Sequence, residues 1–313
     1  MLFLSRACVY LALIGNVLLI AQQPMLPGEP PRGFGASVTG AFEGWFQHPD
    51  GSFSFLVGYL NRNRARAIDV PIGPNNRIEP GPSTALGTSP ATSLRAIGPD
   101  MGQPTHFLPG RRTGMFVVNV PKEFSRQDRL TWTIVVNGVT NTIPLRLHTD
   151  YNISPLRIQY DTAGYNNTPP RVRFTESGAA FQAPLAVVGK PGLTLTTSIG
   201  APLSLPIWTE DDAAFSSGSN APLSDPPPPP VEILWSKYRG PGDVTFDHAE
   251  PKLEVLAGGK VNQPFRGRGT TTAKFSAPGE YLLHVLASDY SGDGGGGEVC
   301  CWTTALVRVT VTP

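Results

Sequence analysis

The residues that could do chemistry gather between Gly58 and Arg112, where polar and turn residues replace the plain alternation of strands. The sequence reads GYLNRN from Gly58, IGPNN from Ile72 and GQPTHFLP from Gly102. The candidate binding residues of this stretch are Asn61, Arg62, Asn63, Asp69, Asn75, Asn76, Gln103, His106 and Arg111. Such side chains among many Pro and Gly residues predict a loop fixed by side-chain to backbone hydrogen bonds.

His106 is the only histidine in this stretch, and it could form a small polar site with Asp69 and Arg62. A hydrolase would also need a nucleophile and a base within reach of each other. The sequence contains no Gly-x-Ser-x-Gly elbow and no pair of histidines at a metal-ligand spacing. We therefore expect a non-enzymatic protein. The alternative is a carbohydrate-binding or hydrolytic protein whose site lies in the loops from Asn61 to His106.

A second candidate site is a calcium site near the C-terminus. The sequence DYSGDG from Asp289 has oxygen-bearing residues where a calcium loop places them, but Cys300 stands where an EF-hand has its glutamate. Oxygen ligands from loops at one end of a β-sandwich could still converge on calcium, and the candidates are Asp211, Asp289 and Asp293. The alternative is a solvated, glycine-rich hairpin tip. No other cofactor is expected.

Aromatic residues offer a third kind of site, because sugars stack on exposed aromatic rings. The candidates for such a platform are Trp45, Phe46, Tyr59, Trp132, Tyr151 and Trp208. At strand spacing, the alternative is that these side chains belong to the core.

The N-terminus has the outline of a secretory signal, with Arg6 before an apolar run from Ala7 to Ala21. The run is shorter than the roughly 20 residues that span a bilayer, so a membrane anchor is the weaker alternative. We expect a signal peptide over residues 1–21, a Pro-rich linker over 22–36, and no membrane span in the mature chain. The predicted location is secreted or periplasmic.

Removal of the signal peptide would leave Cys300 and Cys301 as the only cysteines. Adjacent residues on a strand point to opposite faces, so this pair cannot join two distant segments of one chain. The alternatives are a vicinal disulfide, one buried and one exposed thiol, or links to another chain.

Composition predicts an all-β fold, because 34 Gly and 33 Pro among 313 residues leave few windows for a long helix. The net charge of +1 gives no reason to expect a nucleic-acid partner. The Asp50-Gly51 and Asn137-Gly138 pairs predict hairpin turns. Residues 115–120, 130–136 and 139–143 are expected to be consecutive antiparallel strands.

Strand and turn spacing predicts an N-terminal β-sandwich over residues 37–160, a connection over 161–182 and a second β-sandwich over 183–313. In the second half, Trp235, the Gly240-Pro-Gly turn, Pro278-Gly-Glu-Tyr281 and Ala287-Ser-Asp289 occur in order. This pattern resembles the PKD-type immunoglobulin-like domains of secreted proteins. The resemblance implies a β-sandwich used for spacing or adhesion.

The three motifs of the first half, together with the CCWT sequence from Cys300, resemble a group of secreted bacterial proteins that carry the same motifs. The likeness covers nearly the whole chain and implies secretion, with no particular activity attached. We therefore expect a partner at the cell surface, either a protein or a glycan.

Overall fold

The computed structural model describes residues 28–81, 98–154, 167–215, 223–290 and 301–313. Residues 31–313 form one compact unit, and residues 1–30 form another, of which the described residues 28–30 contain no regular element. Strands make up almost all the regular structure, and the one helical element described is a 3-10 turn, η2 (Thr149–Tyr151). The prediction of an all-β fold is confirmed. No helix in the described ranges is long and apolar enough to cross a membrane.

The described strands divide at the η2 turn. Those before it are β1 (Val38–Gln47), β2 (Phe53–Asn61), β3 (Ile68–Asp69), β4 (Asn76–Pro80), β5 (His106–Phe107), β6 (Gly110–Val120), β7 (Leu130–Val136) and β8 (Val139–Leu145). Those after it are β9 (Arg171–Arg173), β10 (Leu193–Ser198), β11 (Leu203–Asp211), β12 (Glu232–Arg239), β13 (Val244–Phe246), β14 (Glu254–Ala257), β15 (Phe265–Phe275), β16 (Gly279–Ser288) and β17 (Trp302–Thr312).

The strands before η2 form a first sandwich. One sheet has the order β1-β2-β6, the facing sheet has the order β4-β7-β8, and β3 and β5 form a separate pair. Inward-facing residues of β2 and β6, such as Phe55 and Phe116, share a buried core with Trp132 and Ile134 of β7. Alternation places these side chains on the faces that meet.

Both predicted hairpin turns occur. Asp50-Gly51 joins β1 to β2, with Gly51 at a φ of 87°. Asn137-Gly138 joins β7 to β8 with φ values of 51° and 77°, as a type I′ turn requires. The expected pairing of residues 115–120 with 130–136 is wrong, because β6 pairs with β2 and β7 pairs with β4 and β8. The chain between β6 and β7 crosses from one sheet to the other.

The strands after η2 form a second sandwich. One sheet has the order β10-β17-β16-β12, the other has the order β13-β15-β11-β9, and β14 pairs with β15. Their inner faces share one core, which includes Trp235 of β12, Val285 of β16, Ile207 of β11 and Phe275 of β15. The pairing of β10 with β17 is parallel, whereas the other strand pairs of this sandwich are antiparallel.

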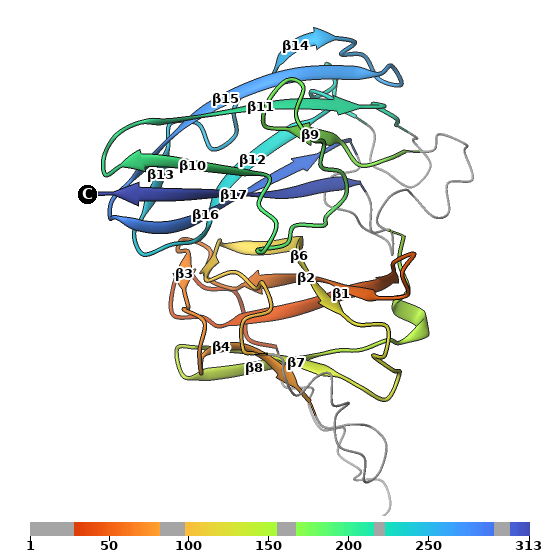
Figure 1. Ribbon diagram of the computed structural model, residues 1–313, viewed down its shortest axis with the longest axis vertical. Coiled ribbons are helices and arrows are strands. Elements are labelled where there is room, and N and C mark those ends of the chain that lie inside the picture. The colour runs from red at the N-terminus through yellow and green to blue at the C-terminus, as the bar shows by residue number, and fades with distance from the viewer. Residues whose placement is uncertain (1–27, 82–97, 155–166, 216–222, 291–300) are drawn as a thin grey trace, which may run out of the picture. The chain divides into compact units, whose positions relative to one another are not determined.

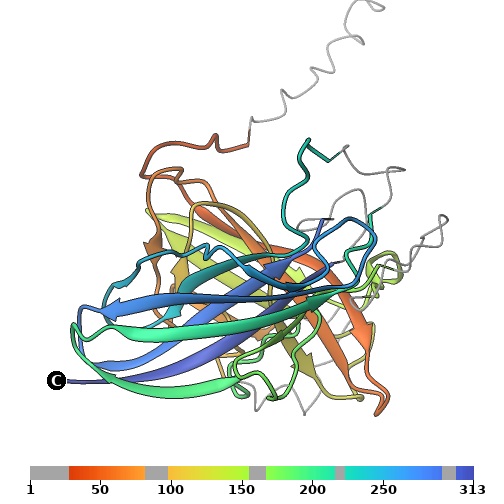
Figure 2. The same cartoon turned by 90° about the horizontal axis from the view of Figure 1, so that it is seen from above.

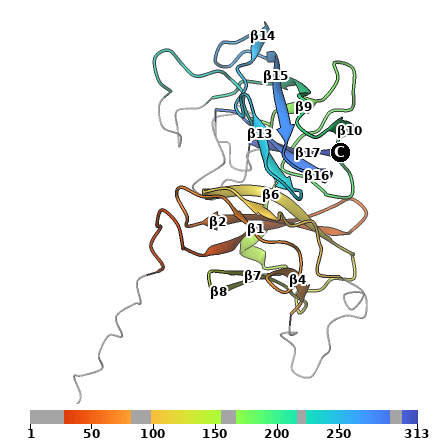
Figure 3. The same cartoon turned by 90° about the vertical axis from the view of Figure 1, so that its left-hand side faces the viewer.

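The sheet of β1, β2 and β6 is covered on both faces. Leu56 and Val117 point away from the first core and pack with Trp302 of β17 and with the partly buried Leu286 of β16. The sheet therefore lies between β4-β7-β8 and the β16-β17 pair (Figures 1 and 3). Seen from above, strands of the two sandwiches cross rather than run alongside each other (Figure 2).

Gly114 of β6 provides a test of this contact. Its φ is +52°, and a Cβ there would lie 2.6 Å from Nε1 of Trp302. We expect Gly114→Ala to lower the free energy of unfolding by about 2–4 kcal/mol, from overpacking and from left-handed backbone strain. Urea denaturation measures this change.

The matched control is Gly110→Ala on the same strand. Gly110 also has a positive φ, +81°, but no atom lies within 4 Å of its Cβ position. This variant should lose only about 1 kcal/mol of its free energy of unfolding, because alanine is strained in a left-handed backbone conformation. Equal losses in the two variants would contradict close packing of Trp302 on β6.

Candidate functional site

Asn61 and Asn63, from the first motif, are buried and bonded to backbone and to each other. Asn61 Nδ2 donates to the carbonyls of Arg66 (3.1 Å) and Phe107 (2.9 Å). Asn63 Nδ2 donates to the carbonyl of Ala36, and its Oδ1 accepts from the Ala36 amide at 2.8 Å. Asn61 Oδ1 accepts from Asn63 N and Nδ2 at 2.9 and 2.8 Å. These amides hold loop backbone and have no surface to offer a ligand.

Asn76 and Gln103, from the other two motifs, are also buried. Asn76 Nδ2 donates to the carbonyls of Val70 (2.9 Å) and Pro104 (2.8 Å), and its Oδ1 accepts from Trp132 Nε1 at 3.0 Å. The Gln103 side chain accepts from the Met101 amide through Oε1 and donates to the Pro99 carbonyl through Nε2. The sequence predicts a loop fixed by side-chain to backbone bonds, and these four amides make such bonds.

Three other predicted site residues have separate surroundings. Arg62 Nη1 donates to the hydroxyls of Thr39 and Ser37. Arg111 pairs with the buried carboxylate of Glu43 at 2.7 Å. Asn75 is exposed. In the described part of the chain, no hydrogen bond or ion pair joins Arg62 to Asp69 or His106.

Asp69 and His106 do meet, on the paired strands β3 and β5. His106 Nδ1 lies 2.9 Å from Asp69 Oδ1, and Lys237 Nζ of β12 donates to the same oxygen at 3.1 Å. Partial burial raises the pKa of Asp69, but the bonds and charges of His106 and Lys237 outweigh it and leave the pKa below its usual value. The Lys237 side chain is only 6% exposed, so its ammonium depends on this carboxylate.

Next to this cluster, four residues form what we call the β12 clamp: Asp100, Gln103, Tyr238 and Arg239. The Arg239 guanidinium binds both oxygens of Asp100 at 2.9 and 2.8 Å and donates from Nε to the Gln103 carbonyl at 2.9 Å. The Tyr238 hydroxyl donates to the Gly102 carbonyl, and the Tyr238 carbonyl accepts from the Thr105 amide at 3.1 Å. The clamp thus joins the third motif to the edge strand of the second sandwich.

Lys237, Tyr238 and Arg239 are functional-site residues that the sequence analysis missed. Their signal is the run from Ser236 to Arg239, where three polar residues interrupt a strand that begins with apolar alternation. Consecutive polar residues at the end of a strand indicate that both faces there meet polar groups.

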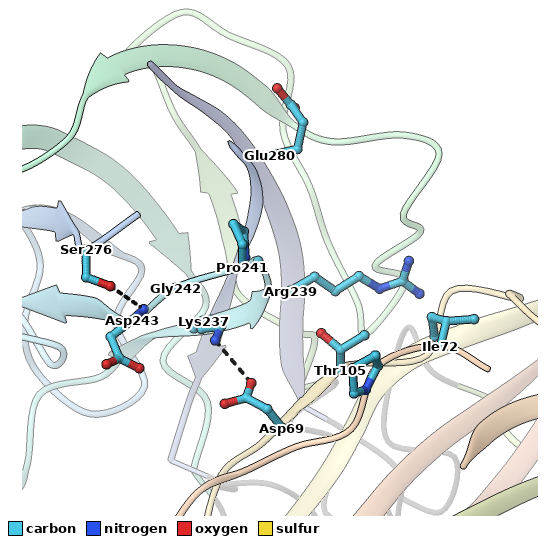
Figure 4. A pocket seen from close by; sticks show the side chains of 12 residues that line it. Asp69, Ile72, Thr105, Lys237, Arg239, Pro241, Gly242, Asp243, Ser276 and Glu280 are labelled. Atoms are coloured by element: carbon cyan, nitrogen blue, oxygen red, sulfur yellow. Dashed lines mark hydrogen bonds and ion pairs between the residues drawn. The ribbon is translucent and has the colours of Figure 1, made fainter. Parts of the chain in front are cut away.

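An open depression of about 560 Å³ borders the Asp69 cluster. It is lined from the first sandwich by Asp69, Ile72 and Thr105, and from the second by Lys237 and the Gly240-Pro241-Gly242 turn. Figure 4 shows the Lys237 ammonium pointing toward the Asp69 carboxylate in the wall of this depression. Asp243 and Glu280 add negative charge to its rim. Of the predicted binding residues, only Asp69 lines it.

The calcium candidates are placed in part. Asp211 ends β11 and Asp289 follows β16; both are buried, and Asp293 lies outside the described residues. Burial, followed by the charges of Asp289 and Asp212, raises the pKa of Asp211 to about 8. In the described ranges, no group of three His, Cys, Asp or Glu side chains could hold a metal ion.

The cysteine pair is also placed in part. Cys301 is buried and disulfide-bonded, whereas Cys300 and the chain's remaining cysteine, Cys8, lie outside the described residues. The Cys301 sulfur lies 3.5 Å from the Asn167 carbonyl. Because a disulfide sulfur has no hydrogen to donate, this is a packing contact.

Three of the aromatic candidates for a sugar-stacking platform belong to the core instead, and a fourth packs under an arginine. Tyr59 and Trp132 are fully buried in the first core, and Phe46 is buried beside Trp302. Trp208 lies under the guanidinium of Arg268, 5.3 Å from the ring centre. The alternative reading, that aromatics at strand spacing belong to the core, is correct for Tyr59, Phe46 and Trp132.

A buried histidine lies where the two sandwiches meet. His284 of β16 is 1% exposed and stacks on Tyr238 with ring centres 5.7 Å apart. Burial lowers its pKa to about 4; a bond to the Met115 backbone partly opposes this, and the charge of Arg112 adds a smaller lowering effect. The imidazole is therefore neutral in the folded protein at neutral pH.

The Asn76 bonds predict a large loss of stability in Asn76→Ala. The change leaves two buried carbonyls and the Trp132 indole nitrogen without partners. We expect the free energy of unfolding to fall by about 3–5 kcal/mol in chemical denaturation. The adjacent, exposed Asn75→Ala is the control and should change it by less than about 0.5 kcal/mol. Similar effects at both positions would show that the Asn76 amide does not carry these bonds.

His284 predicts a pH-dependent stability. Between pH 6.5 and about 4 the unfolded chain binds a proton at this residue and the folded protein does not, so the free energy of unfolding falls as pH falls. The total effect is about 3 kcal/mol. It should appear as a difference between wild type and His284→Gln in denaturation at pH 7, 5.5 and 4. The exposed His248→Gln should differ from wild type by the same free energy of unfolding at all three pH values. If the difference between wild type and His284→Gln were also independent of pH, titration of His284 would be ruled out.

Comparisons with known proteins add little to this geometry. No family model and no curated protein matches the sequence. Among solved structures, the S-layer protein SbsC domains 4 and 5 align with 89% of this chain and 98% of their own, at 10% identity and a TM-score of 0.20. Rst D1-D2 aligns with 88% of this chain and 100% of its own, at 9% identity and a TM-score of 0.26. TM-scores this low carry no argument, so the all-β assignment depends on the strand pairing itself.

Proposed function

We propose that this chain is a secreted, non-enzymatic β-sandwich protein that acts as a rigid structural or interaction module outside the cytoplasm. The main observation behind the proposal is that polar side chains between Gly58 and Arg112 are occupied by bonds to the protein's own backbone and by ion pairs. The buried amides of this stretch hold loop backbone, and its third motif is held by the β12 clamp. Residues that could have served a reaction instead hold the loops of the first sandwich, and Asp69 and residues 102–105 bond to β12 of the second.

Three features support a location outside the cytoplasm. Arg6 precedes an apolar run of the kind typical of secretory signals. Cys301 is disulfide-bonded, and such bonds persist in oxidising compartments. The strands of the second sandwich carry the PKD-like pattern, with Trp235 in the core and Gly240 packed against Tyr281. We infer a PKD-like role in spacing or adhesion from that pattern.

The Asp69–His106 pair is the arrangement that comes nearest to a hydrolase. A catalytic carboxylate of this kind orients a histidine toward a nucleophile. Here Lys237 binds the same carboxylate oxygen as His106, so the carboxylate neutralises a buried ammonium. This favours a structural ion pair. The depression beside it is then a surface for a protein or glycan partner at the cell surface.

The β12 clamp predicts that the chain unfolds as one cooperative unit. In scanning calorimetry the wild type should give one transition with equal calorimetric and van't Hoff enthalpies. Arg239→Gln removes the bidentate pair with Asp100 and the bond to Gln103. We expect this change to lower the free energy of unfolding by about 2–4 kcal/mol and to broaden or split the transition.

The control is Arg77→Gln, which removes a more exposed ion pair with Glu79. It should cost at most about 1 kcal/mol and leave a single transition. Two transitions in the wild type, or an Arg239 variant as stable as wild type, would show that the clamp does not make the sandwiches one unit.

A further inference from the structure

We propose that Asn167, Asp211 and Asp289 bind a calcium ion at the end of the second sandwich where β11 and β16 finish. Asp211 is the last residue of β11, and Asp289 follows the last residue of β16. The two strands belong to opposite sheets of the sandwich, and the charge of Asp289 acts on the Asp211 carboxyl. Asp211, Asp289 and Asn167 are 9%, 7% and 4% exposed.

Asp211 needs a positive partner. Its Oδ2 accepts from the Ala213 amide at 2.7 Å, but its buried Oδ1 has no hydrogen-bond donor. The adjacent Asp212 is itself a carboxylate and adds negative charge, while its Oδ2 accepts from the amide and hydroxyl of Thr168. The nearby arginines Arg173 and Arg266 pair with Glu210 instead. An ionised carboxylate with a buried oxygen that no donor reaches is strongly unfavourable unless a cation or a proton binds it.

Neutral oxygens without donors gather at the same end of the sandwich. In the described part of the chain they are Asn167 Oδ1, Thr209 Oγ1 and the Tyr290 hydroxyl. Asn167 is held there because Thr168 is bonded to Asp212, and the negative charge of Asp211 acts on Tyr290. Buried side-chain atoms that lack partners elsewhere in the described ranges are nitrogens, from Arg112, Trp235 and His284. The unsatisfied oxygens are therefore confined to this region.

The donor set selects calcium. All the atoms are hard oxygens, from two carboxylates, an amide and a hydroxyl, with no nitrogen or thiolate ligand of the kind that zinc prefers. Calcium accepts six to eight oxygens in irregular geometry, including neutral ones, whereas magnesium demands a near-ideal octahedron. An open depression lined by Thr168, Asp211 and Asp212 gives the ion a path from solvent. The ion would fix the ends of β11 and β16, which belong to opposite sheets.

The test is calorimetric titration of the full chain, freed of metal with EDTA, with calcium chloride alone. We expect one calcium ion per chain, a melting temperature that rises with calcium and falls with EDTA, and a much weaker response to magnesium. Asp211→Asn should lower the calcium affinity at least tenfold and abolish the thermal shift. The exposed Asp225→Asn is the matched control and should behave like wild type.

The competing account is a proton shared by Asp211 and Asp289. It predicts no heat of calcium binding, no effect of EDTA, and an Asp211→Asn variant more stable than wild type with or without calcium; these results would overturn the proposal. An equal response to magnesium would overturn the assignment to calcium. If Asp211→Asn fails to fold, the wild type can be tested with terbium, whose luminescence is excited through nearby Tyr290. We expect luminescence on adding terbium and its loss when calcium displaces the terbium. The absence of luminescence would count against the site.

Discussion

The sheet of β1, β2 and β6 must find apolar cover for both of its faces, and the rest of the fold supplies it. Phe55 and Val57 alternate with Ser54 and Leu56 along β2, and every one of these residues is buried. The sheet β4-β7-β8 covers one face, and Trp302 with its neighbours covers the other. A sheet placed in this way cannot lose the second sandwich without exposing a large apolar surface to water.

A second requirement explains the polar stretch from Gly58 to Arg112. Loops that pack against the core of the first sandwich carry backbone groups out of reach of water, and each must find a partner. Amide side chains can donate and accept at once, which is why Asn61, Asn63, Asn76 and Gln103 occupy these positions. The edge of β12 is closed at the same time, since the Thr105 amide bonds to Tyr238 and the Ala249 carbonyl to Trp235. An edge strand so covered is protected from pairing with other chains.

Local sequence predicts much of the first sandwich and little of the site. The Asn137-Gly138 turn and the strand Leu130–Val136 could be predicted because backbone conformation and alternation are encoded within a few residues. The sheet that β6 joins could not, because it depends on which surfaces cover its two faces. Asp69 and Lys237 are brought together from distant parts of the sequence, and no short pattern links them. Buried amides and ligand-binding amides also look alike in sequence, since both are polar residues among Pro and Gly.

The parallel pairing of β10 with β17 also has a consequence for how the protein folds. Residues Leu193–Ser198 pair with Val307–Thr312, and β17 lies between β10 and β16 in its sheet. The sheet therefore has a gap at its centre until residues 302–312 have been synthesised, and Trp302 is also needed to cover the first sandwich. Contacts so distant in sequence form slowly. Neither the β10-β17-β16-β12 sheet nor the cover of the first sandwich can therefore be complete before the last strand is in place.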